Sequence, residues 1–362
     1  MHRLLEEARR ALEAADPGRA VRLAGRALAE GAPPLAAHRV TAEALAGVLR
    51  RTGLLGTDLR PGPVDAATLA ASPAGDTVRE LVEALQRSLS ALAGLGESAG
   101  LRELHELAET VMRPRVLAAP EGPPAASRIV VSMLCCERPG LLARTLADLR
   151  RLEMPAADVV CLDDASRDPR VRELLLGTDP GPHRVHVLRN EGFTSRSPAV
   201  GTNAILRYVE ERLGGFEWLM IVDSDVALAE DAWTASLATW RALADHEFPE
   251  GRVGLVTGFH SEAAHPAVRV VEVDGVRARI KETVGACHLV IPRETWERAL
   301  GPMDHLQDWG WCQRLRAHGL FPAATVPSRV QHLGEESLLW HARVDVAEDF
   351  AREAPGAERI AG

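Results

Sequence analysis

The pattern of apolar and polar residues divides the chain near residue 117. Before that point, apolar residues such as Leu4, Ala8 and Leu12 recur at helical spacing, and a Pro-Gly pair at 17–18 interrupts the pattern. Further helices are predicted over 21–28, 35–50, 76–95 and 101–113. The order of helices and tight turns resembles a tetratricopeptide unit, but a plain helical bundle explains it equally well. We therefore expect an all-α domain over residues 1–117.

A different pattern follows a Gly- and Pro-rich stretch over 118–127, which we expect to be a flexible linker. Short apolar runs that predict strands, at 128–135, 158–162, 184–188 and 218–222, now alternate with predicted helices at 140–152, 171–176, 197–213 and 231–243. This alternation is typical of a mainly parallel, doubly wound sheet. The β-rich segment 253–292 adds strands at its far side. We expect one α/β domain over 128–340 and a C-terminal helix or tail over 341–362.

Composition narrows the possible partners and the compartment. The net charge of −9 argues against nucleic acid or an anionic membrane as the main partner. No apolar run approaches the roughly 20 residues that span a bilayer, and the N-terminus is charged and amphipathic. The five cysteines show no CxxC spacing. These features predict a soluble cytoplasmic protein with reduced thiols.

Two acidic residues, Asp223 and Asp225, directly follow the apolar run at 218–222. In an open α/β sheet the carboxyl ends of the strands are where ligands bind. Two carboxylates at such an edge can hold a hard divalent cation, which can in turn hold a diphosphate. The alternative interpretation is that Asp223 caps the next helix or turn.

A second predicted strand, at 158–162, also ends in acids, Asp163 and Asp164. Asp164 or Ser166 could simply cap the next helix. Acids at the ends of two strands of one sheet nevertheless favour a site for a polar ligand and a cation. A dinucleotide site is not indicated, because the residues after the first strand lack the G-x-G-x-x-G pattern, and the chain has no P-loop sequence.

Two downstream residues are further candidates for chemistry. Asp308 opens an amphipathic helix that ends near Gly319, where the helix dipole alone would favour an acid. His332 lies in a short predicted strand over 328–334. A lone histidine is more often a structural residue than a ligand, so His332 gains weight only if other ligands lie close to it.

Taken in order, these segments resemble glycosyltransferase family 2, whose members are inverting enzymes with the GT-A fold. The resemblance covers residues 128 to about 334. The segment 160–168 is similar to the family's VVDDGSxD motif, and Asp223-Ser224-Asp225 is similar to its DXD motif. The resemblance implies that Asp164 contacts the nucleotide base and that Asp223 lies near the ribose. It implies that Asp225 binds Mn²⁺ or Mg²⁺, with His332 completing the site.

The resemblance also implies roles on the acceptor side. Gln307 and Asp308 fall on the family's ED pair, whose second acid is the catalytic base, so Asp308 is the expected base. Gln307 departs from the usual Glu. The acceptor and donor pocket is expected to include Gly285, Ala286, Gln307 and Trp309.

The phosphate side of the family pattern is altered in this chain. Its NxGxxxARN segment corresponds to the residues that follow Asn190, which leaves Arg196 as an expected diphosphate contact. Arg138 is a further expected nucleotide-sugar contact. These residues complete the expected nucleotide-sugar site.

The resemblance predicts a metal-dependent glycosyltransferase whose donor is a nucleotide-diphosphate sugar, with a UDP-sugar favoured. The acceptor is a peptide, a natural product or a glycan precursor. The N-terminal domain would bind the acceptor or another chain, or form a homodimer. Two alternatives stay open: a sugar nucleotidyltransferase, and a helical scaffold fused to an inactive transferase domain.

Overall fold

The chain separates into two compact units, Met1–Arg115 with Asn190–Val200 and Val116–Arg189 with Gly201–Gly362. The computed structural model describes residues 2–13, 20, 23–24, 26–27, 114–190, 198–304, 306–333, 346–347 and 349–350. In the first unit, α1 (His2–Glu13) packs Ala8 and Ala11 against Leu23 and Ala24. The predicted first helix is thereby confirmed. The other expected N-terminal helices, the tetratricopeptide interpretation and most of the C-terminal tail lie outside the described residues.

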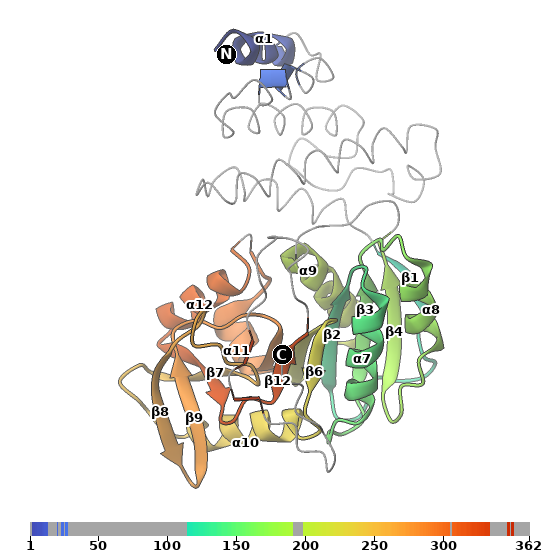
Figure 1. The fold of residues 1–362 in the computed structure, drawn as a ribbon. Helices are drawn as coiled ribbons and strands as arrows, with labels where there is room; N and C mark the ends of the chain where they lie inside the picture. The colour runs from blue at the N-terminus through green and yellow to red at the C-terminus, as the bar shows by residue number, and fades with distance from the viewer. Residues whose placement is uncertain are drawn as a thin grey trace. The chain divides into compact units, whose positions relative to one another are not determined.

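The second unit is built on a ten-stranded sheet with the order β1-β4-β3-β2-β5-β10-β7-β11-β9-β8 (Figure 1). Its strands are β1 (Arg115–Ala118), β2 (Ile129–Cys135), β3 (Asp158–Asp163), β4 (Arg184–Arg189), β5 (Trp218–Asp223), β7 (Arg252–Thr257), β8 (Ala267–Val273), β9 (Val276–Lys281), β10 (His288–Pro292) and β11 (Leu320–Thr325). Two short strands, β6 (Val226–Leu228) and β12 (Val330–His332), form a separate antiparallel pair.

The two halves of the large sheet differ in strand direction. Strands β4, β3, β2 and β5 are parallel neighbours, as the alternating pattern predicts. In the second half β10 runs antiparallel to both β5 and β7, whereas β11 is parallel to β7. The last two strands, β8 and β9, form a hairpin whose turn residues Asp274 and Gly275 both have positive φ. The expected strands at the far side are therefore present, but this half of the sheet is mixed.

Helices lie on both faces of the sheet. They are α7 (Pro139–Arg150), α8 (Pro169–Gly177), α9 (Pro198–Tyr208), which continues as a π-helical turn over Val209–Leu213, α10 (Ala232–Ala244), α11 (Arg293–Thr295), which continues over Trp296–Leu300, and α12 (Asp308–Ala317). Leu142 and Leu146 of α7 and Val171 of α8 pack against the face of β2 that carries Val131 and Met133. The other face of β2 meets α9 so closely that a Cβ on Gly201 would lie 2.5 Å from Leu134. The predicted double winding is confirmed for this half.

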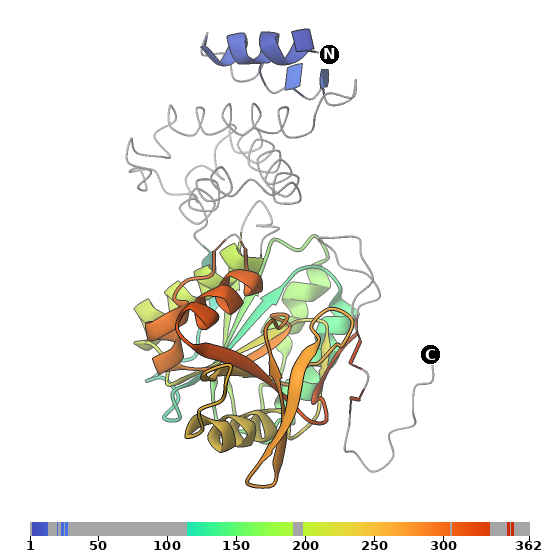
Figure 2. The same cartoon turned by 90° about the vertical axis from the view of Figure 1, so that its left-hand side faces the viewer.

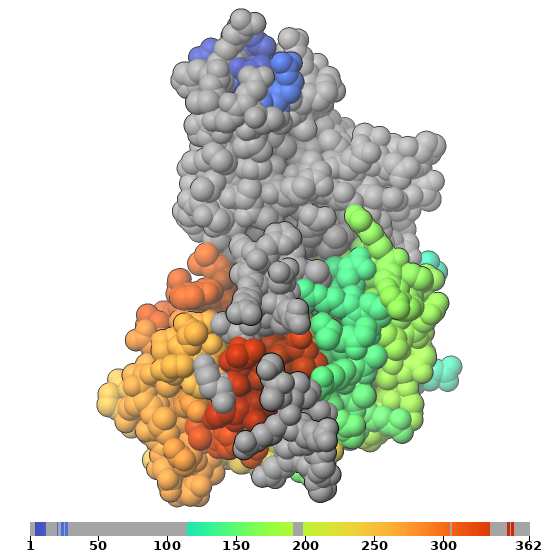
Figure 3. All heavy atoms as spheres, in the orientation of Figure 1, coloured from blue at the N-terminus to red at the C-terminus, as the bar shows by residue number. Residues whose placement is uncertain are grey.

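The second half has its own apolar core. Leu243 of α10 packs against Val253 and Val256 of β7 and Ile280 of β9. Figure 2 shows the β8–β9 hairpin (orange) extending from the body of this unit. On the face shown in Figure 3, the red segment near the end of the described chain comes to the surface between the green first half and the orange hairpin. Within the described ranges, no helix is long and apolar enough to cross a membrane.

The segment predicted as a flexible linker is mostly exposed but is anchored to the sheet unit at Ala125. Strand β1 forms the edge of the sheet beside β4. Ala125 is buried, and its backbone N–H donates to Asp158 Oδ2 at 2.7 Å. Asp158 is itself buried and also binds Arg184 and His186. The sequence does not reveal this anchor, because Asp158 lies 33 positions further along the chain.

Candidate active site

The turn between β5 and β6 carries the first two acidic side chains. Strand β5 ends at Asp223, and β6 begins directly after Asp225. Two buried side chains of α7 hold β6 in place: Thr145 Oγ1 accepts from Val226 N at 3.1 Å, and Asp148 Oδ2 accepts from Leu228 N at 3.1 Å. The two acids therefore lie on a turn at the carboxyl end of a central strand. The turn is fixed by β5 on one side and by β6, which α7 holds, on the other.

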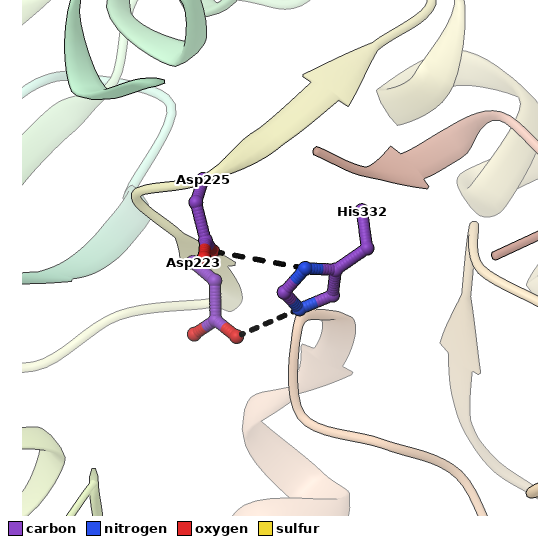
Figure 4. A group of neighbouring side chains, drawn as sticks. All are labelled: Asp223, Asp225 and His332. Atoms are coloured by element: carbon purple, nitrogen blue, oxygen red, sulfur yellow. Dashed lines mark ion pairs between the residues drawn. The ribbon is translucent and has the colours of Figure 1, made fainter. Parts of the chain in front are cut away.

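His332 reaches these acids through the pairing of β12 with β6. His332 is the register partner of Val226, and Leu333 N donates to Asp225 O at 2.8 Å. The imidazole Nε2 lies 3.8 Å from Asp223 Oδ2, and Nδ1 lies 3.9 Å from Asp225 Oδ1 (Figure 4). The structure thus brings Asp223, Asp225 and His332 together, although His332 is far from both acids in the sequence.

A buried histidine on β10 helps to place β12. His288 is fully buried, and its Nδ1 accepts a hydrogen bond from Gly258 N at 3.0 Å. The carbonyl of Gly258 in turn accepts from Arg329 N at 2.7 Å and Val330 N at 3.1 Å. Desolvation lowers the pKa of His288 to about 4, which keeps its ring neutral and able to accept.

The three clustered side chains have the chemistry of a divalent-cation site. Asp223, Asp225 and His332 each offer one ligand atom, and these atoms lie within 4.8 Å of one another. Carboxylate oxygen suits Mg²⁺ and Mn²⁺, and imidazole is a common additional ligand. Desolvation raises the pKa of Asp223, and the like charges of Asp225 and Asp308 raise it further, although 44% of its side-chain surface is still exposed. A cation would relieve this repulsion, so these residues fit the expected metal.

Arg138 is a fourth member of this cluster. Its Nη1 lies 2.7 Å from Asp225 Oδ2. Arg138 is the N-cap residue of α7 and has a left-handed backbone conformation, with φ 55° and ψ 55°. This expected nucleotide-sugar contact therefore lies against the expected metal ligand Asp225.

The acids at the end of β3 take different roles. Asp163 is completely buried, forms an ion pair with Arg189 and accepts from Ser166 N at 2.9 Å. Asp164 is also buried, and its backbone N–H donates to Cys135 O, at the end of the neighbouring strand, at 2.8 Å. Neither Asp164 nor Ser166 caps the next helix, since Asp168 caps α8 by accepting from Arg170 N.

Asp308 opens α12, as predicted, and is held by two backbone hydrogen bonds. Its Oδ2 accepts from Ala286 N at 3.1 Å, and its Oδ1 accepts from Trp309 N at 2.9 Å. Desolvation raises the pKa of Asp308, while these two hydrogen bonds lower it in part. The loop at 285–287 links it to the first cluster, because Cys287 O accepts from Asp223 N at 2.9 Å.

The residues expected in the acceptor pocket surround Asp308. A Cβ added to Gly285 would lie 3.4 Å from His265 Nε2 and 4.0 Å from Asp308 Oδ2. The ring of His265 lies 6.3 Å from that of Trp309, a residue that is 53% exposed. Asp308, Gly285, His265 and Trp309 therefore lie close together, with Trp309 exposed to solvent.

Gln307 adopts an uncommon backbone conformation beside the expected base. Its φ of 57° and ψ of −129° are rare for any residue other than glycine. Gln307 N donates to Asp304 O at 2.9 Å, and Asp304 Oδ1 accepts from Leu306 N at 2.8 Å. Asp304 thus shapes the turn that leads into α12.

Most of the residues that the structure brings together in these two clusters were therefore expected from the sequence. Arg196 lies outside the described residues. Sequence reasoning missed Thr145, Asp148, His265 and His288, which act through long-range contacts without a local motif. Lys281 was also missed as a site residue, although its being the only lysine of the sequence was a visible signal.

Comparison with known proteins agrees with the ordered motifs. Residues 130–253 match the family model described as glycosyl transferase family 2. This segment, less than half of the chain, runs from β2 into β7 and contains Asp164, Asp223 and Asp225. It identifies a glycosyltransferase domain in the chain. The chain has no match among curated proteins.

Several solved structures are similar at low identity. The mannosyltransferase PcManGT from Pyrobaculum calidifontis, in complex with GDP-Man and Mn²⁺, has 18% identity and a TM-score of 0.39, over 70% of this chain and 69% of its own. S. aureus TarS 1–349 in complex with UDP-GlcNAc has 14% identity and a TM-score of 0.40, over 60% of this chain and 61% of its own. A longer S. aureus TarS structure has 13% identity and a TM-score of 0.40, over 57% of this chain and 37% of its own. The chain thus spans less than two thirds of either TarS structure.

Proposed function

We propose that the protein is a metal-dependent, inverting glycosyltransferase that moves a sugar from a nucleotide-diphosphate sugar to an acceptor hydroxyl. The observation that carries this proposal is the meeting of Asp223, Asp225 and His332 at the carboxyl edge of the sheet, with Asp308 close enough to raise the pKa of Asp223. One cluster suits a cation and a diphosphate, and the other offers a proton acceptor. The family match over 130–253 supports the same reading.

The donor side is assigned to the first cluster. Asp225 and His332 would hold Mn²⁺ or Mg²⁺, and Asp223 lies close enough to be a third ligand. The bound ion would supply positive charge that stabilises the departing diphosphate. Asp164 would contact the nucleotide base, and Arg138 the diphosphate. The proposed donor is a UDP-sugar.

The acceptor side is assigned to Asp308 and its surroundings. The acceptor oxygen attacks the anomeric carbon on the face opposite the diphosphate while its proton passes to Asp308. A new carbon–oxygen bond forms, and the bond to the diphosphate oxygen breaks, its electron pair leaving with the nucleoside diphosphate. The configuration inverts because attack and departure occur on opposite faces. Desolvation of Asp308 favours this role, since a raised pKa brings a carboxylate base nearer to neutral pH.

Gly285, Ala286, Gln307 and Trp309 would line the space for the acceptor, which is a peptide, a natural product or a glycan precursor in this proposal. Residues 1–117 are the candidate for binding that acceptor or for pairing two chains. Both assignments follow from the sequence. The assignment of the acceptor pocket gains support from the hydrogen bond that Trp309 N donates to Asp308 Oδ1.

The test is a thermal-shift panel of UDP-, GDP- and dTDP-sugars with Mn²⁺ and, separately, with EDTA. One nucleotide class should raise the melting temperature only when the metal is present, and that donor should then be hydrolysed slowly in a metal-dependent reaction. Asp225→Asn should abolish the metal-dependent shift. Asp179→Asn makes the same charge change at an exposed ion pair and should leave the shift intact.

The proposal is wrong if none of these donors stabilises the protein or is hydrolysed in the presence of Mn²⁺. Release of pyrophosphate from a nucleoside triphosphate and a sugar phosphate would instead favour the nucleotidyltransferase alternative. Metal-dependent hydrolysis of a nucleotide sugar would exclude the inactive scaffold.

A further inference from the structure

Arg138 lies against the carboxylate that a cation would need. Its Nη1 is 2.7 Å from Asp225 Oδ2, and the two side chains are 23% and 15% exposed. The other oxygen of Asp225 faces His332 Nδ1 at 3.9 Å. One carboxylate oxygen is thus already engaged in a charge-assisted hydrogen bond. A divalent ion that binds Asp225 must share this oxygen with Arg138 or displace it.

The backbone that presents Arg138 is strained. Glu137 and Arg138 have φ values of 54° and 55°, a left-handed conformation that residues with a side chain adopt rarely. Such strain persists only where the surroundings impose it. Here Glu137 N donates to Ser166 Oγ at 2.9 Å, and Glu137 Oε1 accepts from Arg167 N at 2.9 Å. These contacts hold the turn in the shape that directs the guanidinium to Asp225.

The charge of the cluster explains why a positive group is needed there. Asp223, Asp225 and Asp308 are close enough for their charges to interact, and His332 is their neighbour. Carboxylates in a partly desolvated site repel one another unless a cation balances them. In the absence of a ligand, Arg138 supplies that balance from within the chain.

We propose that Arg138 is a positioning residue that competes with the divalent cation for Asp225 and thereby makes the cation and the nucleoside diphosphate bind cooperatively. The diphosphate offers the guanidinium a second, bidentate partner. When Arg138 turns to the diphosphate, Asp225 is released to the cation. By linkage, each ligand then raises the affinity for the other by the same factor. The inference rests on the proposed function, because it assumes a diphosphate donor and a cation at Asp225 and His332.

The test measures Mn²⁺ binding directly, from the electron paramagnetic resonance signal of free Mn²⁺, without any enzymatic turnover. The dissociation constant is determined for the full chain alone, with UDP and with GDP. Three variants are compared with the wild type. Arg138→Gln removes the competing charge, and Arg138→Lys keeps a charge but loses the planar fork. Arg269→Gln removes the same charge from the Arg269–Glu250 ion pair on β8, outside the cluster.

Arg138→Gln should bind Mn²⁺ alone about tenfold more tightly than the wild type, a factor within the usual range of coupling between sites. The gain in Mn²⁺ affinity on adding the nucleotide should shrink by a similar factor. Arg138→Lys should lie between the two, which keeps the test valid if Arg138→Gln folds poorly. Arg269→Gln should match the wild type.

Two results would overturn the inference. If Arg138→Gln and Arg138→Lys bind Mn²⁺ no more tightly than the wild type, or show the same nucleotide-dependent gain, the competition does not exist and the proposed function still stands. If Mn²⁺ binds to no form of the chain, with or without either nucleotide, both the inference and the proposed cation site fail.

Discussion

At the scale of single residues, Asp308 depends on its surroundings for its proposed role. Each of its carboxylate oxygens accepts one backbone hydrogen bond, from Ala286 N and Trp309 N, so the group has a fixed orientation. These bonds favour the charged form, whereas desolvation disfavours it more strongly and raises the pKa. A carboxylate that is oriented and partly desolvated suits a general base.

The substitution Asp308→Asn should lower the rate of sugar transfer by about 10²–10⁴-fold, because the amide cannot take the acceptor proton. Binding of the nucleotide should change little, since Asp308 is not among its proposed contacts. Transfer rates and nucleotide dissociation constants are measured on the same preparations. Transfer by this variant at the wild-type rate would show that another group is the base.

At the scale of elements, Lys281 connects the segment after β7 to the end of β9. It is the only lysine of the chain and is 1% exposed. Its Nζ lies 2.7 Å from His260 Nδ1 and also donates to the carbonyl oxygen of His265. Because His265 lies beside Gly285 and Trp309, this ammonium group supports one wall of the proposed acceptor region.

Replacing Lys281 with Met should lower the free energy of unfolding by about 2–3 kcal/mol, because buried partners lose charge-assisted hydrogen bonds. Arg277→Met, at an exposed position of the same strand, should change it by less than about 0.5 kcal/mol. Urea denaturation of both variants measures the difference. Equal stability of the two variants would mean that the Lys281 contacts contribute nothing.

At the scale of the whole molecule, buried His288 connects the stability of the fold to pH. Its pKa of about 4 lies below the ordinary value of 6.5, so between these values the unfolded chain binds a proton that the folded chain does not. The stabilisation that the neutral His288 ring contributes is fully present above pH 6.5 and is lost as the pH falls toward 4. The same ring holds Gly258, whose carbonyl holds the start of β12 and hence the position of His332.

The wild type should therefore lose about 3 kcal/mol of stability between pH 6.5 and 4 through His288 alone, at 1.36 kcal/mol per pKa unit. His288→Asn retains an acceptor for Gly258 N but cannot titrate. The difference in unfolding free energy between the two proteins, measured by urea denaturation across this pH range, isolates the contribution. A difference that does not vary with pH would contradict the assignment, whatever the other titrating groups do.

Much of the first half of the sheet unit was predictable, since its signals are local. The runs that became β2, β3 and β5 are apolar on both faces, and the helices between them carry periodic apolar residues. The second half was less predictable. The antiparallel insertion of β10 between β5 and β7 depends on packing across many residues, and the packed segment around Ala125 depends on Asp158.

The sequence by itself determined the α/β class and the acids at the strand ends, because strand periodicity and the place where a run stops are local properties. It also pointed to Asp308 and His332 as chemical candidates. The family resemblance implied that His332 joins Asp225, but only the tertiary structure shows how His332 meets Asp223 and Asp225, since the pairing of β12 with β6 is long-range. The ion pair between Arg138 and Asp225 was also visible only in the tertiary structure, because these residues lie 87 positions apart and no local sequence pattern indicates their contact.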